Sequence, residues 1–339
     1  MEETRKQLLK YVGNVSQLAS VEQMTFDDGK RRGMRVFQVK NAAGLQFDVV
    51  PDKCMDIHAL SYKGVNISWQ AKTGYGSAAH AGPVVGEFGH YFAGGMLWTC
   101  GLKNTGDEYV TETGAFQHAH GRIGITPAEN VWSKAAWEGE RYVLSMGGEA
   151  RDVELCSHNL CLSRVIRTPM DKAEVEITDT LTNDEPTATD YLILYHFNFG
   201  YPLISPETKF LLPEPIAPMR PRTPAAEAGK ETWDVLRAPI DEEEEQCFFH
   251  HLKPDENGNC RIRVENPACG IGAYLEFSAE HLPIVTFWKS ERSGEYVVGI
   301  EPGNSYIGGM DDARKTGVLG HIDGFSQKEF RLKLGFYDL

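Results

Sequence analysis

The stretch VEITDTLT, Val175–Thr182, alternates apolar or branched side chains with polar ones. Successive side chains of a β-strand point to opposite faces of the sheet, so a period of two predicts a strand with one buried face. We expect this strand to begin at Ala173. The stretch favours a fold built from sheets.

Short β-prone runs of the same kind recur along most of the chain, whereas helical periodicity is scarce. The other predicted strands are Arg35–Lys40, Leu45–Val50, Val65–Trp69, Tyr142–Met146, Leu160–Ile166, Cys260–Val264, Ile271–Phe277, Ile284–Trp288, Tyr296–Glu301 and Phe330–Phe336. Many short strands, together with 34 glycines and 17 prolines, are typical of a large antiparallel sandwich or barrel. We therefore predict an all-β protein, with residues 1–339 forming a single domain.

The N-terminal segment departs from this pattern. Residues 4–12 carry Leu8, Leu9 and Val12 at helical offsets, and Gly13 follows them. This spacing predicts one short amphipathic helix within an N-terminal extension over residues 1–20.

A second departure lies between residues 201 and 245. The segment is too rich in proline for central strands, and it ends in the acidic run Asp241–Glu245. We interpret it as a long surface excursion whose acidic end is a solvated loop. Metal binding at the acidic run is the less favoured alternative.

The composition limits the classes of partner. A formal net charge of −14 argues against nucleic acid or an anionic membrane, because phosphate binding depends on clustered Lys and Arg. Seven cysteines without a CxxC pair suggest reduced thiols. Neither a signal-peptide core nor an apolar stretch of about 20 residues is visible, so we expect a cytoplasmic protein.

Three short islands carry most of the chemical information: His118–Arg122, Tyr195–Gly200 and Gly299–Asn304. Each places a proton-transfer residue among aromatic residues, glycines or β-formers. Histidine exchanges protons near neutral pH, and a partly desolvated Glu can be raised towards the same range. The islands therefore suggest a site with two histidines and one carboxylate facing a small molecule.

These islands, with the run Leu45–Ile57 (LQFDVVPDKCMDI), resemble the aldose 1-epimerase, or galactose mutarotase-like, superfamily. The order of His120, His196 and Glu301 along the chain agrees with that superfamily, and the resemblance spans nearly the whole chain. It looks closest to a little-characterised, bacterial-type branch.

The resemblance implies a β-supersandwich of antiparallel sheets whose concave face binds a monosaccharide. It further implies Glu301 as the base, His196 as the acid, and His120 assisting at the ring oxygen or a hydroxyl group. Neither a metal nor an organic cofactor is expected. Residue chemistry agrees, because exchange of sugar anomers removes a proton from the C1 hydroxyl while the ring oxygen is protonated. The alternative for His196 and Glu301 is a purely structural, hydrogen-bonded role in the core.

Further substrate-binding candidates lie near the islands. Trp98 offers a ring for stacking on a sugar, and Lys103 and Asn104 offer hydrogen-bond donors, although Trp98 is equally suited to core packing. Arg122 and Asn198 neighbour the proposed catalytic residues, although a strand neighbour can point away from the site.

His118 is also a substrate-binding candidate, and its spacing from His120 puts both rings on one face of a predicted strand. Such a pair can bind zinc or another divalent cation. We do not favour a metal, because no HExxH motif or cysteine-containing ligand set accompanies the pair.

Some features of the superfamily have no clear counterpart in this sequence. The arginine that precedes the first histidine is not identified, and Asp234 is a weak candidate for the sugar-binding aspartate. A phosphorylated sugar would need a basic cluster. Lys103, Arg122, Arg220 and Arg222 are available for one, but nothing in the sequence brings them together, so we favour an unphosphorylated sugar.

Two other classes of function remain open beside anomer exchange. One is another sugar isomerase, epimerase or lyase that uses the same acid and base, including a metal-assisted one. The other is a carbohydrate-binding protein without turnover. A homodimer is also left open, because the sequence does not locate exposed edge strands.

Overall fold

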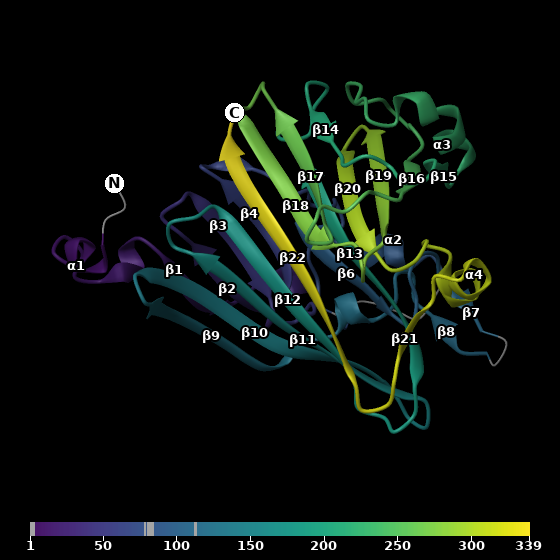
Figure 1. Ribbon diagram of the computed structural model, residues 1–339, viewed down its shortest axis with the longest axis horizontal. Helices are drawn as coiled ribbons and strands as arrows, with labels where there is room; N and C mark the ends of the chain where they lie inside the picture. The colour runs from purple at the N-terminus through teal and green to yellow at the C-terminus, as the bar shows by residue number, and fades with distance from the viewer. Residues whose placement is uncertain (1–3, 78, 80–84, 112–113) are drawn as a thin grey trace.

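The structure is a computed structural model that describes residues 4–77, 79, 85–111 and 114–339, and it consists mainly of antiparallel strands (Figure 1). A five-stranded sheet contains, in spatial order, β1 (Ser20–Thr25), β2 (Arg35–Lys40), β3 (Leu45–Val50), β4 (Asp56–Tyr62) and β5 (Val65–Asn66). An eight-stranded sheet contains β14 (Lys209–Leu211), β17 (Asn259–Asn266), β18 (Ile271–Ser278), β22 (Gln327–Asp338), β12 (Glu174–Asn183), β11 (His158–Pro169), β10 (Arg141–Glu154) and β9 (Glu129–Glu138).

A seven-stranded sheet carries the candidate site. Its path is β15 (Arg220–Pro221), β16 (Gln246–His250), β19 (Ile284–Arg292), β20 (Glu295–Gly303), β13 (Thr189–Gly200) and β21 (Gly320–Ile322), with β6 (Leu97–Leu102) also paired to β13. A two-stranded ribbon contains β7 (Tyr109–Val110) and β8 (Phe116–Gln117). The helices are short: α1 (Arg5–Leu8), α2 (Phe88–Tyr91), α3 (Pro224–Ala228) and α4 (Gly309–Thr316), with 3₁₀ turns η1 (Val15–Gln17), η2 (Gly29–Arg31), η4 (Ile123–Ile125) and η5 (Lys230–Thr232).

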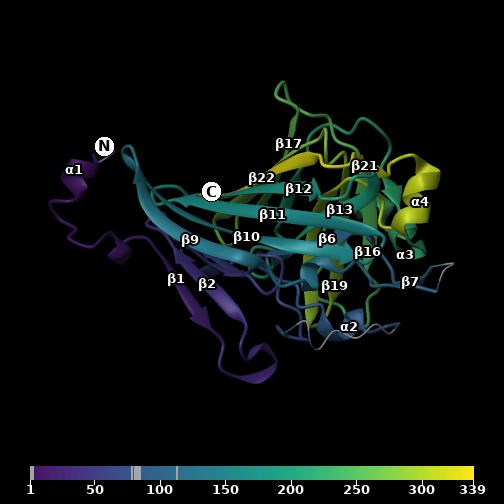
Figure 2. The same cartoon turned by 90° about the horizontal axis from the view of Figure 1, so that it is seen from below.

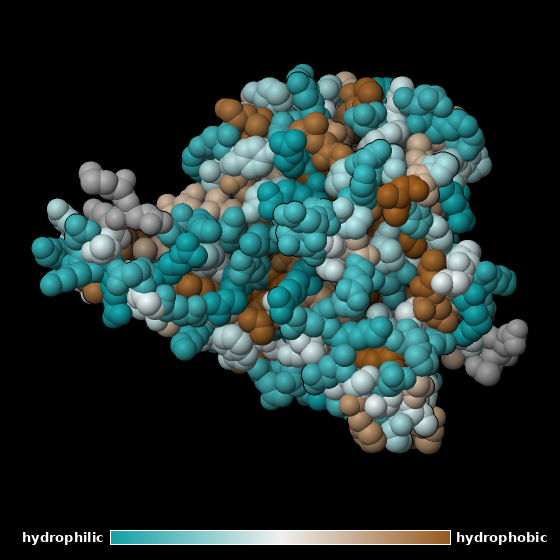
Figure 3. All heavy atoms as spheres, in the orientation of Figure 1, coloured by the Kyte–Doolittle hydropathy of each residue, from teal (hydrophilic) through white to brown (hydrophobic). Residues whose placement is uncertain are grey.

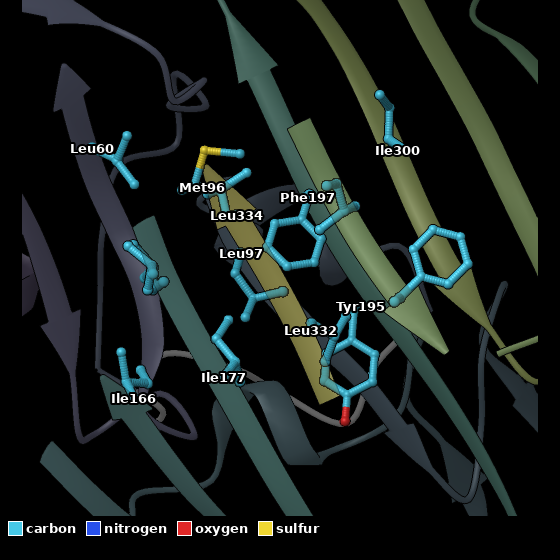
Figure 4. Close-up of a cluster of buried hydrophobic side chains, with 14 of the residues drawn as sticks. Leu60, Met96, Leu97, Ile166, Ile177, Tyr195, Phe197, Ile300, Leu332 and Leu334 are labelled. Atoms are coloured by element: carbon cyan, nitrogen blue, oxygen red, sulfur yellow. The ribbon is translucent and has the colours of Figure 1, made fainter. Parts of the chain in front are cut away.

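The main core lies between the sheets. Figure 4 shows Tyr195 of β13 and Ile300 of β20 in one apolar cluster with Ile177 of β12 and Leu332 of β22. A second, smaller cluster includes Trp98, Cys247 and Phe249, which come from other strands of the seven-stranded sheet. That sheet is therefore packed on both faces, and this explains why its central strands are almost entirely buried.

Alternation along β13 separates these two faces. Tyr195 and Phe197 belong to the main core, whereas His196 and Asn198 point to the opposite face. The aromatic residues of the second island therefore anchor the strand, and they leave the histidine on the face that holds the pocket.

A buried ion-pair network fastens the sheets together behind this strand. Arg164 of β11 lies 2.6 Å from Asp56 and 2.6 Å from Asp179, and all three side chains are almost fully buried. The hydroxyl group of Tyr195 donates to Asp179 at 2.9 Å. Burial raises the pKa of Asp56 to about 6, although the charge of Arg164 opposes this shift. Each charge in the network has a partner, as burial of a charge requires.

The antiparallel β-sandwich predicted from the sequence is confirmed. The predicted bounds of β2 and β3 are correct, whereas β10, β11 and β22 extend beyond the predicted runs because neighbouring strands supply hydrogen-bond partners on both sides. The predicted strand Val65–Trp69 is mostly wrong, since only β5 forms there before isolated bridges take over.

The N-terminal helix is shorter than predicted. α1 comprises four residues, closed at its start by a reciprocal capping box between Thr4 and Gln7, and none of its residues is buried. Without an apolar face packed against the core, a single turn has little to extend it.

The Pro-rich segment 201–245 does not simply cross the surface. It supplies β14 to an edge of the eight-stranded sheet and β15 to an edge of the seven-stranded sheet. In Figure 1 it passes through α3 beside β15 and β16. It therefore brings side chains from a proline-rich region to the rim of the candidate site.

The long strands of the eight-stranded sheet lie side by side in Figure 2, with α4 at the end of the molecule opposite α1. On the face shown in Figure 3, hydrophobic residues lie in separate small patches among hydrophilic ones. All seven cysteines are free thiols. Among the described residues, no helix has the length and apolar character needed to cross a bilayer.

Candidate functional site

The candidate acid and base lie on neighbouring strands of the seven-stranded sheet. The register of β13 and β20 pairs Phe197 with Ile300, and the next step places His196 beside Glu301. Nε2 of His196 lies 3.1 Å from Oε1 of Glu301. Both side chains are almost completely buried, and the sequence-predicted pair thus meets in one place.

Burial controls the protonation of this pair. It lowers the pKa of His196 well below its ordinary value and raises the pKa of Glu301 well above its ordinary value. Both shifts disfavour the charged forms, so the neutral form with a proton on the carboxyl group is favoured at rest. Oε1 of Glu301 lies 3.1 Å from Nε2 of His196 but is not aligned with it for a hydrogen bond, and among the described residues neither this oxygen nor Nδ1 of His196 has a hydrogen-bond partner. The pair therefore has unused hydrogen-bonding capacity.

Gly299 makes room for the carboxylate. It lies two residues before Glu301 and on the same face of β20, and a Cβ built on it would lie 2.5 Å from Oε1 of Glu301. The same Cβ would lie 3.1 Å from Trp288 and 3.2 Å from the ring of His196. The absence of a side chain at position 299 therefore leaves the space that the carboxylate of Glu301 occupies.

His120 approaches the pair from a loop. Its ring centroid lies 5.9 Å from that of His196 and 5.3 Å from that of Phe88. Burial and the nearby charge of Arg222 lower the pKa of His120 to about 4, so this histidine is neutral at pH 7. Its Nδ1 is buried and has no partner among the described residues.

The backbone fixes His120 in an unusual conformation. Its φ is +56°, in the left-handed region, and its carbonyl accepts a hydrogen bond from Gly101 at 2.8 Å. At Gly121 a Cβ would collide with the carbonyl oxygen of Gly101, so the residue that follows His120 must be glycine. The loop thus presents His120 to the pocket from a rigid support.

A cavity of about 380 Å³ opens over the three residues. Four aromatic side chains line it: Trp69, Phe88, Phe92 and Trp288. The ring centroids of Phe92 and Trp288 lie 5.5 Å and 5.4 Å from that of His196. An aromatic wall around a buried acid and base suits a ligand that has both apolar ring faces and polar groups.

Two charged residues of the Pro-rich and acidic excursion also line the cavity. Arg222 pairs with Asp107 at 2.8 Å, and its charge opposes the rise in the pKa of Glu301. Glu245 accepts a hydrogen bond from Nε1 of Trp288 at 2.8 Å, and its charge adds to that rise. The acidic run is mostly exposed, as expected of a solvated loop, and Glu245 at its end nevertheless reaches the rim of the cavity. No signal in the sequence marks Arg222 for this cavity, because only the long-range pairing of β15 with β16 brings it there.

The cavity carries more acidic than basic side chains. Its acidic side chains are Asp107, Glu108, Glu245, Glu295 and Glu301. Its cationic side chains are Lys72 and Arg222, and Lys72 lies 2.6 Å from Glu295, just as Arg222 is held by Asp107. Both cations are therefore already ion-paired with acidic side chains, which disfavours an anionic ligand.

None of the six predicted substrate-binding residues lines the cavity. Trp98 is buried beneath Phe88 and Phe92, with ring centroids 6.4 Å and 5.2 Å away, so it supports the aromatic wall. Lys103 donates to the hydroxyl group of Thr189 and the carbonyl of Asp190, near the start of β13. Lys103 therefore lies away from the candidate pair His196 and Glu301.

The polar candidates Asn104 and Asn198 hold backbone segments. Asn104 donates to the carbonyls of Asp107 and His118, and Asn198 donates to those of Gly95 and His196. Neither lines the cavity. Asn104 thus holds the loop that carries His120, and Asn198 holds the strand that carries His196.

His118 and Arg122 flank His120 without joining it. His118 is buried beside Phe116, with ring centroids 5.1 Å apart, and Arg122 is exposed at the start of η4. Because β8 ends at Gln117, the expected same-face pair of histidines on a strand is wrong. Asp234, the weak aspartate candidate, is exposed and outside the cavity. Within the described ranges, no group of three or more His, Cys, Asp or Glu side chains is arranged to hold a metal ion.

Comparison with solved structures identifies the fold. A Klebsiella pneumoniae protein provisionally named an aldose 1-epimerase superposes with a TM-score of 0.88 at 26% identity, over 96% of this chain and 87% of that one. A galactose mutarotase-like protein from Clostridium acetobutylicum gives 0.66 at 13% identity, over 95% and 100%. Galactose 1-epimerase from Lactobacillus acidophilus gives 0.61 at 9% identity, over 94% and 99%.

A search of curated proteins finds no match. The resemblance seen in the sequence is nevertheless confirmed at the level of the fold, which is that of the galactose mutarotase-like proteins. A family model described as a domain of unknown function, DUF4432, matches residues 31–336. The chain therefore belongs to the DUF4432 family, within the aldose 1-epimerase, galactose mutarotase-like, superfamily.

Proposed function

We propose that this protein exchanges the α and β anomers of a sugar by general acid and base catalysis, without a cofactor. The observation that carries the proposal is the buried contact of 3.1 Å between His196 and Glu301 at a cavity walled by aromatic rings. An acid and a base on neighbouring strands, facing one cavity, can reach two oxygen atoms attached to the same carbon.

The proton balance of the reaction suits a pair that holds one proton. The proton moves from Glu301 to His196 as the sugar binds, because a bound hydroxyl group and the charge of Arg222 stabilise the carboxylate. Glu301 then takes the proton of the C1 hydroxyl while His196 gives its proton to the ring oxygen, and the bond from C1 to the ring oxygen breaks. The open-chain aldehyde rotates at C1, and the reverse transfers close the ring on the other face.

His120 is proposed as a neutral hydrogen-bonding partner for the ring oxygen or an adjacent hydroxyl group. Its lowered pKa keeps it uncharged at neutral pH, so it can make a hydrogen bond without adding a charge beside the pair. The aromatic residues Trp69, Phe92 and Trp288 would pack against the apolar face of the sugar ring.

The charges around the cavity favour a neutral sugar. A phosphate or carboxylate group would meet five acidic side chains, and both cations are already paired with acids. Hydroxyl groups, by contrast, can donate to these carboxylates at little desolvation cost. The proposed substrate is therefore an unphosphorylated aldose.

Anomeric-exchange NMR over a panel of aldoses and ketoses tests the proposal. We expect faster α/β exchange with the wild type, the same rate in the presence of a chelator, and a loss of at least 100-fold in Glu301→Gln and His196→Asn. Arg331→Gln, on the exposed surface of β22, serves as the control. Absence of acceleration for every sugar would overturn the proposal, and so would full activity in either catalytic variant.

Conversion to a different sugar, or a chelator-sensitive rate, would instead favour the other classes of sugar enzyme. Sugar binding without any exchange would indicate a carbohydrate-binding protein. The same NMR spectra distinguish these outcomes, because a new sugar gives new resonances whereas anomer exchange only transfers magnetisation between known ones.

A further inference from the structure

A second cavity of about 350 Å³ adjoins the catalytic one. The two cavities share four lining residues: Asp107, Glu108, Arg222 and Ile307. The ion pair between Arg222 and Asp107 stands at this junction, and the side chain of Asp107 is 84% exposed. The catalytic pocket is therefore one part of a longer cleft.

The register of the seven-stranded sheet shows how the cleft runs. Glu301 is opposite Thr286, Thr286 is opposite Phe249, and Phe249 is opposite Arg220. Residues paired in this way point to the same face, and neighbouring strands are about 4.8 Å apart, so Arg220 lies about 14 Å from Glu301 across the sheet. This span exceeds one sugar ring.

Arg220 lies at the far end of this row of paired residues, away from Glu301. Its guanidinium group lies over the rings of Tyr306 and Phe249, 4.7 Å and 5.7 Å from their centroids. Among the described residues, no carboxylate is within ion-pair distance of it, although Arg222 two residues later is paired with Asp107. A guanidinium stacked on rings is fixed in position, while its N–H groups remain free to donate.

Hydrogen-bond acceptors face the same cavity. Asp311 and Asp312, from the first turn of α4, line it together with Asp107 and Glu108, and Tyr306 is fixed by a contact of 2.8 Å between its hydroxyl group and His251. Four carboxylates against two guanidinium groups disfavour an anion. Donors and acceptors arranged around aromatic rings suit a ligand rich in hydroxyl groups and without net charge.

We infer that this second cavity is a subsite for an additional sugar unit, so that the substrate is a reducing disaccharide or longer oligosaccharide. Its reducing end lies at Glu301 and His196, and its next unit passes the Arg222–Asp107 pair to reach Arg220. The inference rests on the proposed function for the placement of the reducing end.

Isothermal titration calorimetry tests the subsite independently of turnover. The probes are D-glucose and D-galactose against maltose, cellobiose and lactose. We expect at least one disaccharide to bind at least tenfold more tightly than its monosaccharide, and we expect this ratio to fall towards one in Arg220→Ala and in the double variant Asp311→Asn/Asp312→Asn. Thermal unfolding verifies that these variants are folded.

Arg261→Ala is the matched control. Arg261 also lies over a tyrosine ring, 4.6 Å from the centroid of Tyr274, but it is paired with Glu276 and belongs to β17 of the eight-stranded sheet. The affinity ratio should not change in this variant. A wild-type ratio near one, or a ratio that survives Arg220→Ala, would overturn the subsite even if monosaccharide exchange is accelerated. Conversely, a tenfold ratio without exchange of any sugar would support the subsite and reject the proposed reaction.

Discussion

Gly299 and Glu301 share one face of β20, and the carboxylate of Glu301 lies where a side chain at position 299 would be. The missing Cβ is thus part of the site, because it lets a buried carboxylate lie against both His196 and Trp288. This relationship gives the glycine of the third island a positioning role that can be separated from a role in folding.

Gly299→Ala should slow anomer exchange by about 10- to 100-fold, because displacement of a catalytic group by about 1 Å has an effect of this size. The decrease should be in kcat, with little change in KM. Gly13→Ala is the matched control, since a Cβ there meets nothing within 4 Å. Equal loss of kcat in both variants, or a loss explained by a lower melting temperature, would contradict the positioning role.

Arg222 should set the pH range of the reaction. In the proposed reaction, the pair of His196 and Glu301 is active while it holds one proton, between the pKa for gaining a second and the pKa for losing the first. The positive charge of Arg222 lowers the pKa of Glu301, so Arg222→Met should raise both values and move the pH–rate profile to higher pH by about half a unit or more.

Asp107→Asn supplies the opposite test. Removal of the carboxylate leaves the charge of Arg222 uncompensated, so the pH–rate profile should move to lower pH. Profiles measured from pH 5 to 9 for both variants distinguish this electrostatic role from a steric one. Shifts in the same direction would contradict it.

Trp288 and Trp98 should respond differently to substitution. Trp288 lines the cavity and donates to Glu245, so Trp288→Phe should raise the KM or Kd of the sugar about tenfold, which corresponds to about 1.4 kcal/mol. Trp98 is buried behind Phe92, and Trp98→Phe should mainly lower the free energy of unfolding, by about 1 to 3 kcal/mol. Titration calorimetry and urea unfolding measure the two effects. A larger change in affinity for Trp98→Phe than for Trp288→Phe would instead indicate that Trp98 contacts the ligand.

The protein should lose stability as the pH falls from about 6.5 towards 4. Burial lowers the pKa of His58, His120 and His250 to about 4, below the value of about 6.5 in an unfolded chain. Between these values the unfolded state binds protons that the folded state does not. The stability linked to these histidines is therefore complete above pH 6.5 and is lost as the pH approaches 4.

His58→Phe isolates one part of this effect. His58 packs 3.8 Å from the ring of Tyr75, and its Nδ1 has no partner among the described residues, so a phenyl ring can replace it. The decrease in unfolding free energy from pH 6.5 to 5 should be smaller in the variant by about 2 kcal/mol. His90→Phe, at an exposed position, is the control. Urea unfolding at the two pH values measures the difference, and an unchanged slope for His58→Phe would contradict the prediction.

The sequence by itself determined the features that depend on local periodicity and on residue chemistry. Alternation over Val175–Thr182 predicted a strand that lies within β12, and the runs of β2 and β3 were predicted with correct bounds. The order of His120, His196 and Glu301 also predicted the superfamily, and these three side chains meet at one cavity. A period of two is visible in a sequence because it reflects the geometry of a single strand.

Only the tertiary structure decided which residues surround that pair. Arg222 reaches the cavity through the pairing of β15 with β16, and Trp69 reaches it from a segment more than a hundred residues before His196. The same register places Trp98 beneath other aromatic rings and not at the surface of the cavity. Strand alternation in the sequence indicates that a strand has two faces, but long-range pairing and covering loops decide which residues of each face are packed and which line a cavity.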